Sequence, residues 1–257
     1  MKVVILAGGF GTRISEESHL KPKPMINIGD KPILWHIMKI YSYYGFNDFV
    51  ICCGYKGHLI KEYFSNYYLY ESNITFDLRN NNAMETHECQ VEPWKVTLVN
   101  TGLHTMTGGR IKRISSYVND EPFLLTYGDG LCDVDISELV RFHFRHGKIV
   151  TLTAVKPEAR FGYLDLNDNK ISSFREKNFI DGGWINGGFM VLNPEIFEYI
   201  DDDETIFEKK PLERMSEMEE MMAYKHFGFW QSMDTQRDKK KLEKLWLDGN
   251  PIWKKWD

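Results

Sequence analysis

A glycine-rich segment near the start of the chain has the composition of a phosphate-binding loop. Gly8, Gly9 and Gly11 follow the short apolar run 2–7. Backbone amides can approach a phosphate chain closely where no side chain intervenes. The dinucleotide fingerprint does not fit, because Ile14 stands where its third glycine would be, and no Gly-Lys-Ser/Thr follows as in a P-loop. The segment therefore predicts nucleotide binding by a loop other than these two common motifs.

Two basic residues follow the glycines closely enough to place positive charge beside a bound phosphate chain. Phosphoryl transfer needs cations beside the transferring phosphate and the departing pyrophosphate, because negative charge grows there in the transition state. Arg13 and Lys23 could supply this charge. With them, segments 6–13 (Leu-Ala-Gly-Gly-Phe-Gly-Thr-Arg) and 21–25 (Lys-Pro-Lys-Pro-Met) resemble the signature of the sugar-phosphate nucleotidylyltransferase family. A tight glycine turn beside surface cations is the alternative.

The resemblance implies a role for each residue of the signature. It assigns Arg13 to the β- and γ-phosphates of a nucleoside triphosphate and Lys23 to the reacting phosphates, so both are expected to be catalytic. The expected nucleotide cradle consists of Leu6, Ala7, Gly8, Gly9, Gly11 and Thr12. Where relatives hold the base, the residues expected to bind the nucleotide are Thr107, Gly108, Gly109 and Arg110. A simple helix N-terminus is the alternative for this second segment.

Two aspartates far apart in the sequence each follow an apolar segment. Asp129 comes after the run 123–126, at the carboxyl end where ligands of parallel sheets collect. Asp234 lies in 230–235, Trp-Gln-Ser-Met-Asp-Thr. Taken alone, Asp129 fits a turn and Asp234 fits a helix cap. The family uses aspartates at both positions as magnesium ligands, so the resemblance implies Mg²⁺ as cofactor, with Asp129 also catalytic and nucleotide-binding.

The expected binding site for the sugar phosphate is inferred from further matches to the family. Glu176 and Lys177 match its Glu-Lys-Pro segment, although Asn178 stands where the family commonly has proline, which leaves the charged pair intact. The other residues expected to bind the sugar phosphate are Tyr163, Asn186 and Gly187.

Strands alternate with helices through the first 155 residues. Apolar runs typical of buried strands cover 2–7, 48–52, 123–126 and 149–155. Helical periodicity covers 31–44, 58–68, 109–117 and 136–146. This alternation predicts a largely parallel sheet with helical crossovers.

The remaining elements indicate a smaller mixed insertion. Segments 73–78 and 94–99 alternate in character and predict additional strands, whereas 162–165 and 170–174 predict a hairpin and 189–192 a further strand. We therefore predict a three-layer, Rossmann-like α/β nucleotidyltransferase fold with a mainly parallel mixed sheet and a smaller mixed insertion.

Length, composition and charge limit the class of protein to which this chain can belong. A chain of 257 residues with 42% hydrophobic residues can bury one substantial core, so residues 1–257 are expected to form a single domain. A net charge of −5 argues against nucleic-acid binding. The first apolar run is too short for a signal peptide, and no run approaches the roughly 18 apolar residues of a spanning helix. We expect a soluble, cytoplasmic protein with no membrane partner.

The resemblance covers essentially the whole chain and is to family members that use CTP and glucose 1-phosphate. It implies formation of CDP-glucose and pyrophosphate by in-line attack, in the synthesis of surface polysaccharides such as O-antigen. The alternatives are the same chemistry with UTP or another sugar 1-phosphate, and a non-catalytic sugar-nucleotide sensor. The family also forms symmetric assemblies, which implies a homo-oligomer, with a hexamer as one candidate. Trp246, Trp253 and Trp256 are residues of a type enriched at interfaces.

Overall fold

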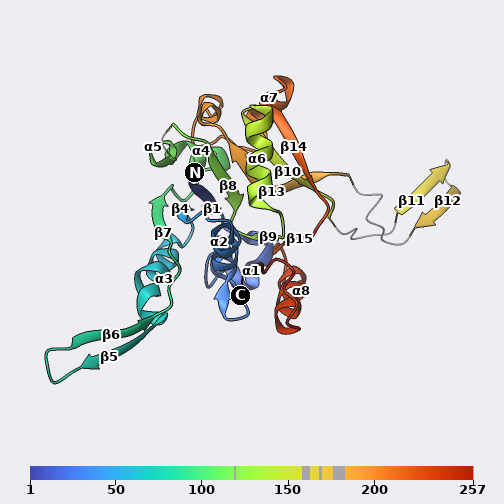
Figure 1. Cartoon of the computed structure of the whole chain (residues 1–257). Helices are drawn as coiled ribbons and strands as arrows, with labels where there is room; N and C mark the ends of the chain where they lie inside the picture. Colours follow the sequence, from blue (N-terminus) through green and yellow to red (C-terminus); the bar gives the residue numbers. More distant parts are fainter. Residues whose placement is uncertain (119, 158–162, 168–169, 176–182, 257) are drawn as a thin grey trace.

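A seven-stranded sheet forms the centre of the computed structural model, which describes residues 1–118, 120–157, 163–167, 170–175 and 183–256 (Figure 1). In sheet order the strands are β14 (Met221–His226), β10 (Val150–Val155), β13 (Ile185–Leu192), β8 (Phe123–Tyr127), β1 (Val3–Ala7), β4 (Asp48–Cys53) and β7 (Lys95–Asn100). Strand β13 is antiparallel to both neighbours, and the other neighbouring pairs are parallel. The predicted mainly parallel mixed sheet is confirmed.

Helices cover both faces of this sheet. Alternate side chains of β1 enter different cores, with Val3 and Ile5 on one face and Val4 and Leu6 on the other. The first core includes side chains of α2 (Ile33–Tyr43), α3 (Gly57–Tyr70), α6 (Ile136–His146) and α8 (Gln236–Leu247). The second includes those of α4 (Thr107–Arg113), α5 (Ser115–Val118) and α7 (Lys210–Glu217). Two helical layers around one sheet confirm the three-layer prediction.

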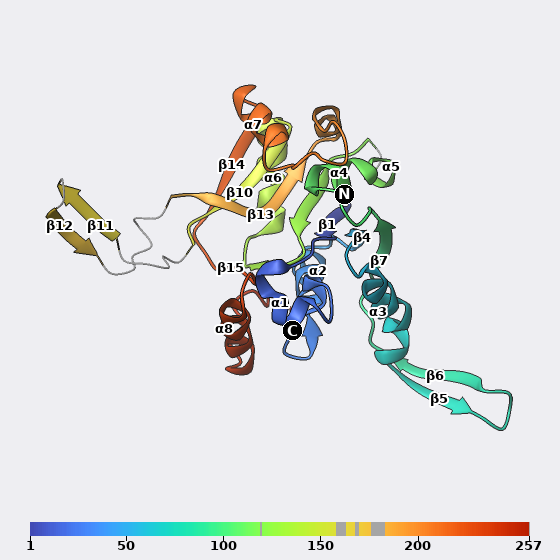
Figure 2. The same cartoon turned by 180° about the vertical axis from the view of Figure 1, so that it is seen from behind.

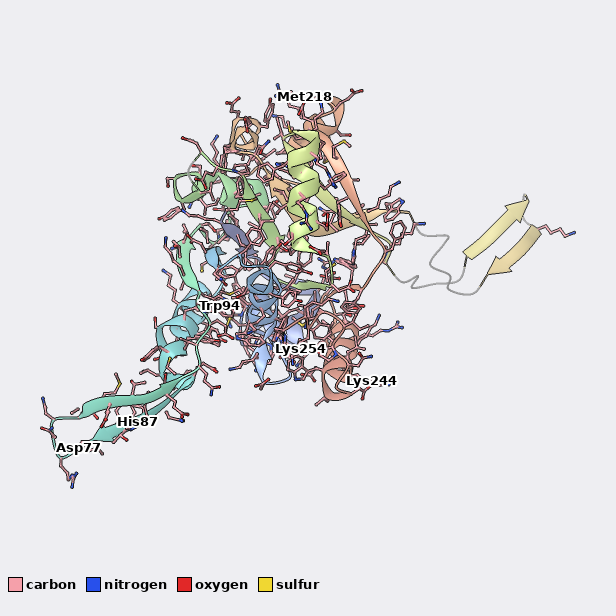
Figure 3. The ribbon with its side chains drawn as sticks, viewed as in Figure 1. Asp77, His87, Trp94, Met218, Lys244 and Lys254 are labelled. Carbon is pink, nitrogen blue, oxygen red and sulfur yellow. The ribbon has the colours of Figure 1, made fainter. Side chains whose placement is uncertain are left out.

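Two hairpins stand apart from the central sheet. Strands β5 (Ser72–Asp77) and β6 (Ala83–Cys89) project from the body beside α3, with Asp77 and His87 far from the core (Figures 1 and 3). Strands β11 (Tyr163–Asn167) and β12 (Lys170–Arg175) form the second, which confirms the predicted hairpin. The sequence did not indicate β6, because its residues are mostly exposed and polar.

Short elements surround the carboxyl ends of β1 and β8. The glycine-rich loop leads into η1 (Thr12–Ile14) and α1 (Ser15–Ser18), and η2 (Lys23–Met25) follows. Strand β9 (Gly130–Cys132) pairs antiparallel with β15 (Trp230–Ser232). In the view from behind, β15 lies between the central sheet and α8 (Figure 2). The remaining elements are β2 (Asn27–Ile28), β3 (Lys31–Pro32) and η3 (Pro194–Tyr199). In the described part of the chain, no helix combines the length and apolar character that crossing a membrane requires.

The tail tryptophans, which the sequence suggested as interface residues, pack against the core of the protein itself. Trp253 is fully buried, and Trp246 and Trp256 pack against the first core. All three rings surround His36 of α2, with ring centroids 4.8 to 6.4 Å away. Burial lowers the pKa of His36 to about 4, although the Ile28 carbonyl oxygen, 2.9 Å from Nε2, opposes the shift.

Candidate active site

The glycine-rich loop lies at the carboxyl end of β1, above a buried arginine. Arg110 of α4 reaches under the loop and donates to the Gly102 carbonyl oxygen at 2.7 Å, the Thr101 hydroxyl at 2.8 Å and the Gly8 carbonyl oxygen at 3.1 Å. A Cβ on Gly8 would lie 2.2 Å from the Arg110 guanidinium, so only glycine fits this packing. Arg110 thus ties the loop to the ends of the neighbouring strands.

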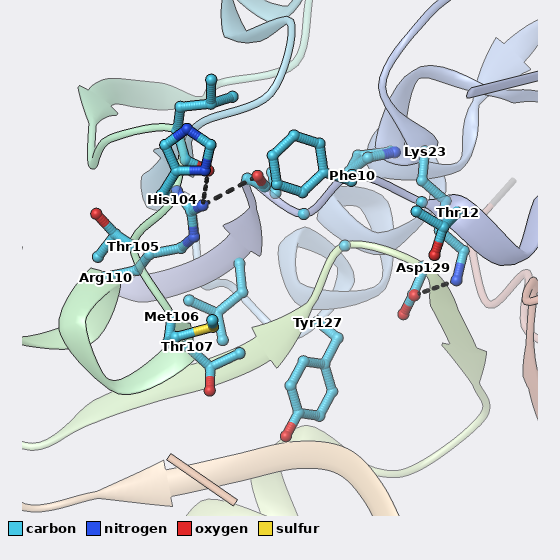
Figure 4. A pocket seen from close by; sticks show the side chains of 18 of the residues that line it. Phe10, Thr12, Lys23, His104, Thr105, Met106, Thr107, Arg110, Tyr127 and Asp129 are labelled. Atoms are coloured by element: carbon cyan, nitrogen blue, oxygen red, sulfur yellow. Dashed lines mark hydrogen bonds and ion pairs between the residues drawn. The ribbon is translucent and has the colours of Figure 1, made fainter. Parts of the chain in front are cut away.

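The loop forms one wall of a cavity of about 540 Å³ (Figure 4). The residues predicted from the sequence that line it are Leu6, Ala7, Gly8, Gly9, Gly11, Thr12, Arg13, Lys23, Thr107, Arg110 and Asp129. The lining also includes residues to which the sequence analysis gave no role, among them Phe10, Leu103, His104, Met106 and Tyr127. The Phe10 ring packs against Tyr55, with centroids 5.2 Å apart, and against His104, at 6.0 Å. The cavity has the volume of a drug-sized ligand site.

Gly108 and Gly109 serve the packing of the backbone, unlike what we expected from the sequence. Their amides donate to the Thr205 carbonyl oxygen at 2.9 and 3.4 Å, and neither glycine belongs to the described lining of the cavity. A Cβ on Gly108 would lie 2.6 Å from that oxygen, and one on Gly109 would lie 2.5 Å from the Asp203 Cα. The two glycines therefore allow segment 203–205 to lie close to α4, and both of their amides are engaged with the Thr205 carbonyl oxygen.

A second cavity, of about 290 Å³, adjoins the first. Arg13, Tyr127 and Asp129 line both cavities, so the two meet at these side chains. The predicted sugar-phosphate residues Asn186 and Gly187 line the second cavity, as does the predicted metal ligand Asp234. Besides Tyr127, the described residues that line it without having been predicted are Thr126, Gly130, Gly188, Phe189, Glu208, Trp230 and Ser232. Glu176, Lys177 and the Tyr163 side chain lie outside the described residues.

Lys23 joins the two predicted aspartates where the cavities meet. Its Nζ lies 2.6 Å from Asp129 Oδ2 and 2.7 Å from Asp234 Oδ1. Arg13 Nη2 approaches the same Asp234 oxygen at 3.1 Å, and Ser232 donates to the other at 3.0 Å. Burial alone would lower the pKa of Lys23, but the two carboxylates outweigh it and raise that pKa. Burial would likewise raise the pKa of Asp234, yet Lys23 and then Arg13 hold it below its usual range.

The β9–β15 pair brings the two aspartates together. Ser232 lies opposite Gly130 in the ladder, and the Met233 amide donates to the Asp129 carbonyl oxygen at 2.8 Å. Asp234 is not the cap of α8, because Thr235 takes that place in a capping box with Asp238. The Asp234 carboxylate therefore faces Lys23, Arg13 and Ser232 rather than the amides of α8.

The donor set suits a hard divalent cation. Carboxylate oxygens are the ligands that Mg²⁺ prefers, with phosphate and water completing the shell. Asp129 and Asp234 already converge on one cation, the Lys23 ammonium. These two aspartates fit the predicted metal site.

Another group of metal-capable side chains, Cys132, Asp133 and His226, has a structural explanation. His226 Nε2 lies 2.8 Å from Asp133 Oδ1, and Lys255 lies 3.8 Å from the other carboxylate oxygen. Burial raises the pKa of the Cys132 thiol, which disfavours the thiolate that a metal would need. We therefore assign this group to an ion-pair network.

A family model described as nucleotidyl transferase matches residues 2–248, and the chain belongs to that family. Members of the family generally use a divalent metal. The chain is 57% identical to a glucose-1-phosphate cytidylyltransferase of Salmonella typhimurium, over 100% of both chains. It is 44% identical to a probable glucose-1-phosphate cytidylyltransferase of Bacillus subtilis, again over 100% of both. HddC from Yersinia pseudotuberculosis supports the fold, with a TM-score of 0.68 at 23% identity over 95% of this chain and 99% of that one.

Proposed function

We propose that this protein transfers the cytidylyl group of CTP to α-D-glucose 1-phosphate, giving CDP-glucose and pyrophosphate. The observation that carries the proposal is the 57% identity to a glucose-1-phosphate cytidylyltransferase over the full length of both chains. The site supports it, because two adjoining cavities meet at Arg13 and Asp129. A reaction that joins two phosphate-bearing substrates needs this arrangement.

The larger cavity would hold CTP and the smaller one the sugar phosphate. The glycine-rich loop would cradle the triphosphate, supported from beneath by Arg110, while Thr107 would contribute from α4. Asn186 and Gly187 would contact the sugar. By resemblance to the family, Tyr163, Glu176 and Lys177 would complete the sugar-phosphate site, with Lys177 bound to the phosphate.

The reacting phosphates would lie beside Lys23 and Arg13. Lys23 is only 7% exposed and stays protonated, so its charge is fixed close to the junction of the cavities. Arg13 lines both cavities and can follow the pyrophosphate as negative charge grows there. Catalysis by positioning and charge neutralisation is expected for phosphoryl transfer.

No general base is required. The second pKa of a phosphate monoester is about 6, so the attacking oxygen is already largely anionic at neutral pH. Asp129 and Asp234 would hold Mg²⁺, which when bound supplies charge neutralisation to the phosphate oxygens. The aspartates therefore act as ligands rather than as proton acceptors.

A pyrophosphate-release assay across four nucleoside triphosphates and several sugar 1-phosphates tests the proposal. We expect turnover with CTP and glucose 1-phosphate that a chelator abolishes and Mg²⁺ restores. Preference for UTP or another sugar would change the substrates and keep the chemistry. Binding of the sugar nucleotide without turnover of any pair of substrates would favour a non-catalytic sensor. A sensor could dispense with Lys23, Asp129 and Asp234, yet all three are present.

We also propose a cytoplasmic homo-oligomer, in keeping with the nucleotide substrate and the assemblies of the family. The tail tryptophans no longer support an interface, since they pack internally. Size-exclusion chromatography with light scattering decides the oligomeric state, and a monomer at micromolar concentration would reject an assembly.

A further inference from the structure

Glu208 connects the two cavities through a pair of hydrogen bonds. It precedes α7, and its Oε2 accepts from the Thr107 hydroxyl at 2.6 Å. Its Oε1 accepts from the Tyr127 hydroxyl, also at 2.6 Å. Thr107 lines the larger cavity, Glu208 the smaller one and Tyr127 both. The carboxylate therefore lies where the two walls join.

The hydroxyl groups of Tyr127 and Thr107 each donate to Glu208 and each accept a further hydrogen bond. The Tyr127 hydroxyl gives its proton to Glu208 and accepts from Asn186 Nδ2 at 3.3 Å. Burial, and then the charge of Glu208, raises the pKa of Tyr127, which keeps this donor protonated. The Asn186 Oδ1 accepts from the Gly188 amide at 2.8 Å. The Thr107 oxygen accepts from the Phe207 amide at 2.9 Å.

Glu208 and Asn186 keep complementary capacity. A carboxylate has about four acceptor positions, and the described contacts of Glu208 use two of them. An amide nitrogen has two hydrogens, and the described contact of Asn186 Nδ2 uses one. An acceptor beside a donor matches a sugar hydroxyl, which both donates and accepts. A charged acceptor also gives the stronger hydrogen bond.

We propose that Glu208 is a sugar-binding and specificity-determining residue that accepts hydrogen bonds from hydroxyl groups of the sugar 1-phosphate. This inference rests on the proposed function and identifies Glu208 as a side chain that recognises the sugar hydroxyl groups. The Glu208 carboxylate also accepts a hydrogen bond from Thr107, so the proposed sugar-binding residue is attached to the wall of the nucleotide cavity.

The test compares the wild-type protein with Glu208→Gln on glucose 1-phosphate and its four deoxy analogues, modified at positions 2, 3, 4 and 6. In the wild type, removing the hydroxyl that Glu208 reads should raise KM by about tenfold to a hundredfold. Glu208→Gln should raise KM for glucose 1-phosphate by a similar factor and bind that one analogue nearly as well as glucose 1-phosphate. CTP affinity measured by calorimetry without sugar should change by less than about threefold.

Glu213→Gln on α7 is the matched control, because it makes the same substitution at an exposed position of the adjacent helix. It should keep the wild-type ranking of the analogues. Glu208→Asp provides a second variant should Glu208→Gln fail to fold, since it keeps the charge and withdraws the oxygens by one methylene. It should lose discrimination against the same analogue.

The outcomes distinguish a wrong role for Glu208 from a wrong proposed function. If the wild type turns over glucose 1-phosphate and the variants at position 208 keep its KM and the ranking of the analogues, the role of Glu208 is wrong. A loss of CTP affinity with unchanged discrimination would also overturn it and leave Glu208 as a support for Thr107. If the wild type itself releases no pyrophosphate from CTP and glucose 1-phosphate, the proposed function fails instead.

Discussion

The backbone amide of Met233 donates to the carbonyl oxygen of Asp129 at 2.8 Å. This bond follows the short β9–β15 ladder and sets the Asp234 carboxylate beside that of Asp129. Both carboxylates then contact the ammonium of Lys23. The geometry of the reaction centre is therefore set by backbone pairing.

Asp129→Asn and Asp234→Asn should each lower kcat by about a hundredfold or more, because each removes the charge of a metal ligand with little change in volume. Steady-state pyrophosphate release at saturating Mg²⁺ measures the effect. The double variant should lose much less than the product of the single losses. Fully multiplicative losses would indicate that the aspartates do not share one metal.

Lys23→Ala should mainly depress kcat, because the buried ammonium lies beside charge that rearranges during transfer. Lys177→Ala should mainly raise KM for glucose 1-phosphate, by about tenfold to a hundredfold, as expected for a lost charge-assisted contact. Initial-rate kinetics separate the two signatures. CTP binding should be nearly unchanged in Lys177→Ala, and a selective loss of CTP affinity there would contradict its assignment to the sugar phosphate.

Gly8→Ala should destabilise the protein by about 1–3 kcal/mol, because the added methyl group would overlap the Arg110 guanidinium and force it to move. Urea unfolding followed by circular dichroism gives the change in free energy. Gly9→Ala is the matched control, since a Cβ there meets nothing within 4 Å. Equal destabilisation of the two variants would show that contact with Arg110 is not the cause.

Stability should fall as the pH drops from about 6.5 to 4, because the unfolded chain binds a proton at His36 before the folded protein does. The pKa falls from 6.5 to about 4, which corresponds to a loss of about 3 kcal/mol, complete near pH 4. Urea midpoints measured across this range give the slope. His36→Gln should reduce it, and an unchanged slope would assign the acid sensitivity to other groups.

The sequence predicted best what local pattern determines. Strands β1, β4 and β8 are buried on both faces, so they appear as continuous apolar runs. Edge strand β14 (Met-Met-Ala-Tyr-Lys-His) carries no such signal, and we did not predict it. Helix α6 was predicted at 136–146, which are its observed bounds, and the structure adds Asp135 as its N-cap and Gly147 at its C-cap.

The residues of the candidate site that belong to sequence motifs could be predicted. The residues that only tertiary contacts bring to the site could not. The loop residues and the two aspartates lie together as the resemblance implied. Glu208 had no local signal, because its partners Thr107 and Tyr127 lie 101 and 81 residues away. The packing role of the two glycines of α4 had no local signal either, because segment 203–205, which they approach closely, lies about 95 residues further along the chain.

The pairing of Lys23 with Asp234 joins residues 211 positions apart. During synthesis, the ribosome adds about 5–20 residues per second, so an emerging chain would spend roughly ten seconds or more with Lys23 made and Asp234 still missing. A chain interrupted before β15 would have only one of the two carboxylates that contact Lys23. Assembly of the reaction centre therefore comes late in biosynthesis, and prematurely terminated products should carry no nucleotide-consuming activity.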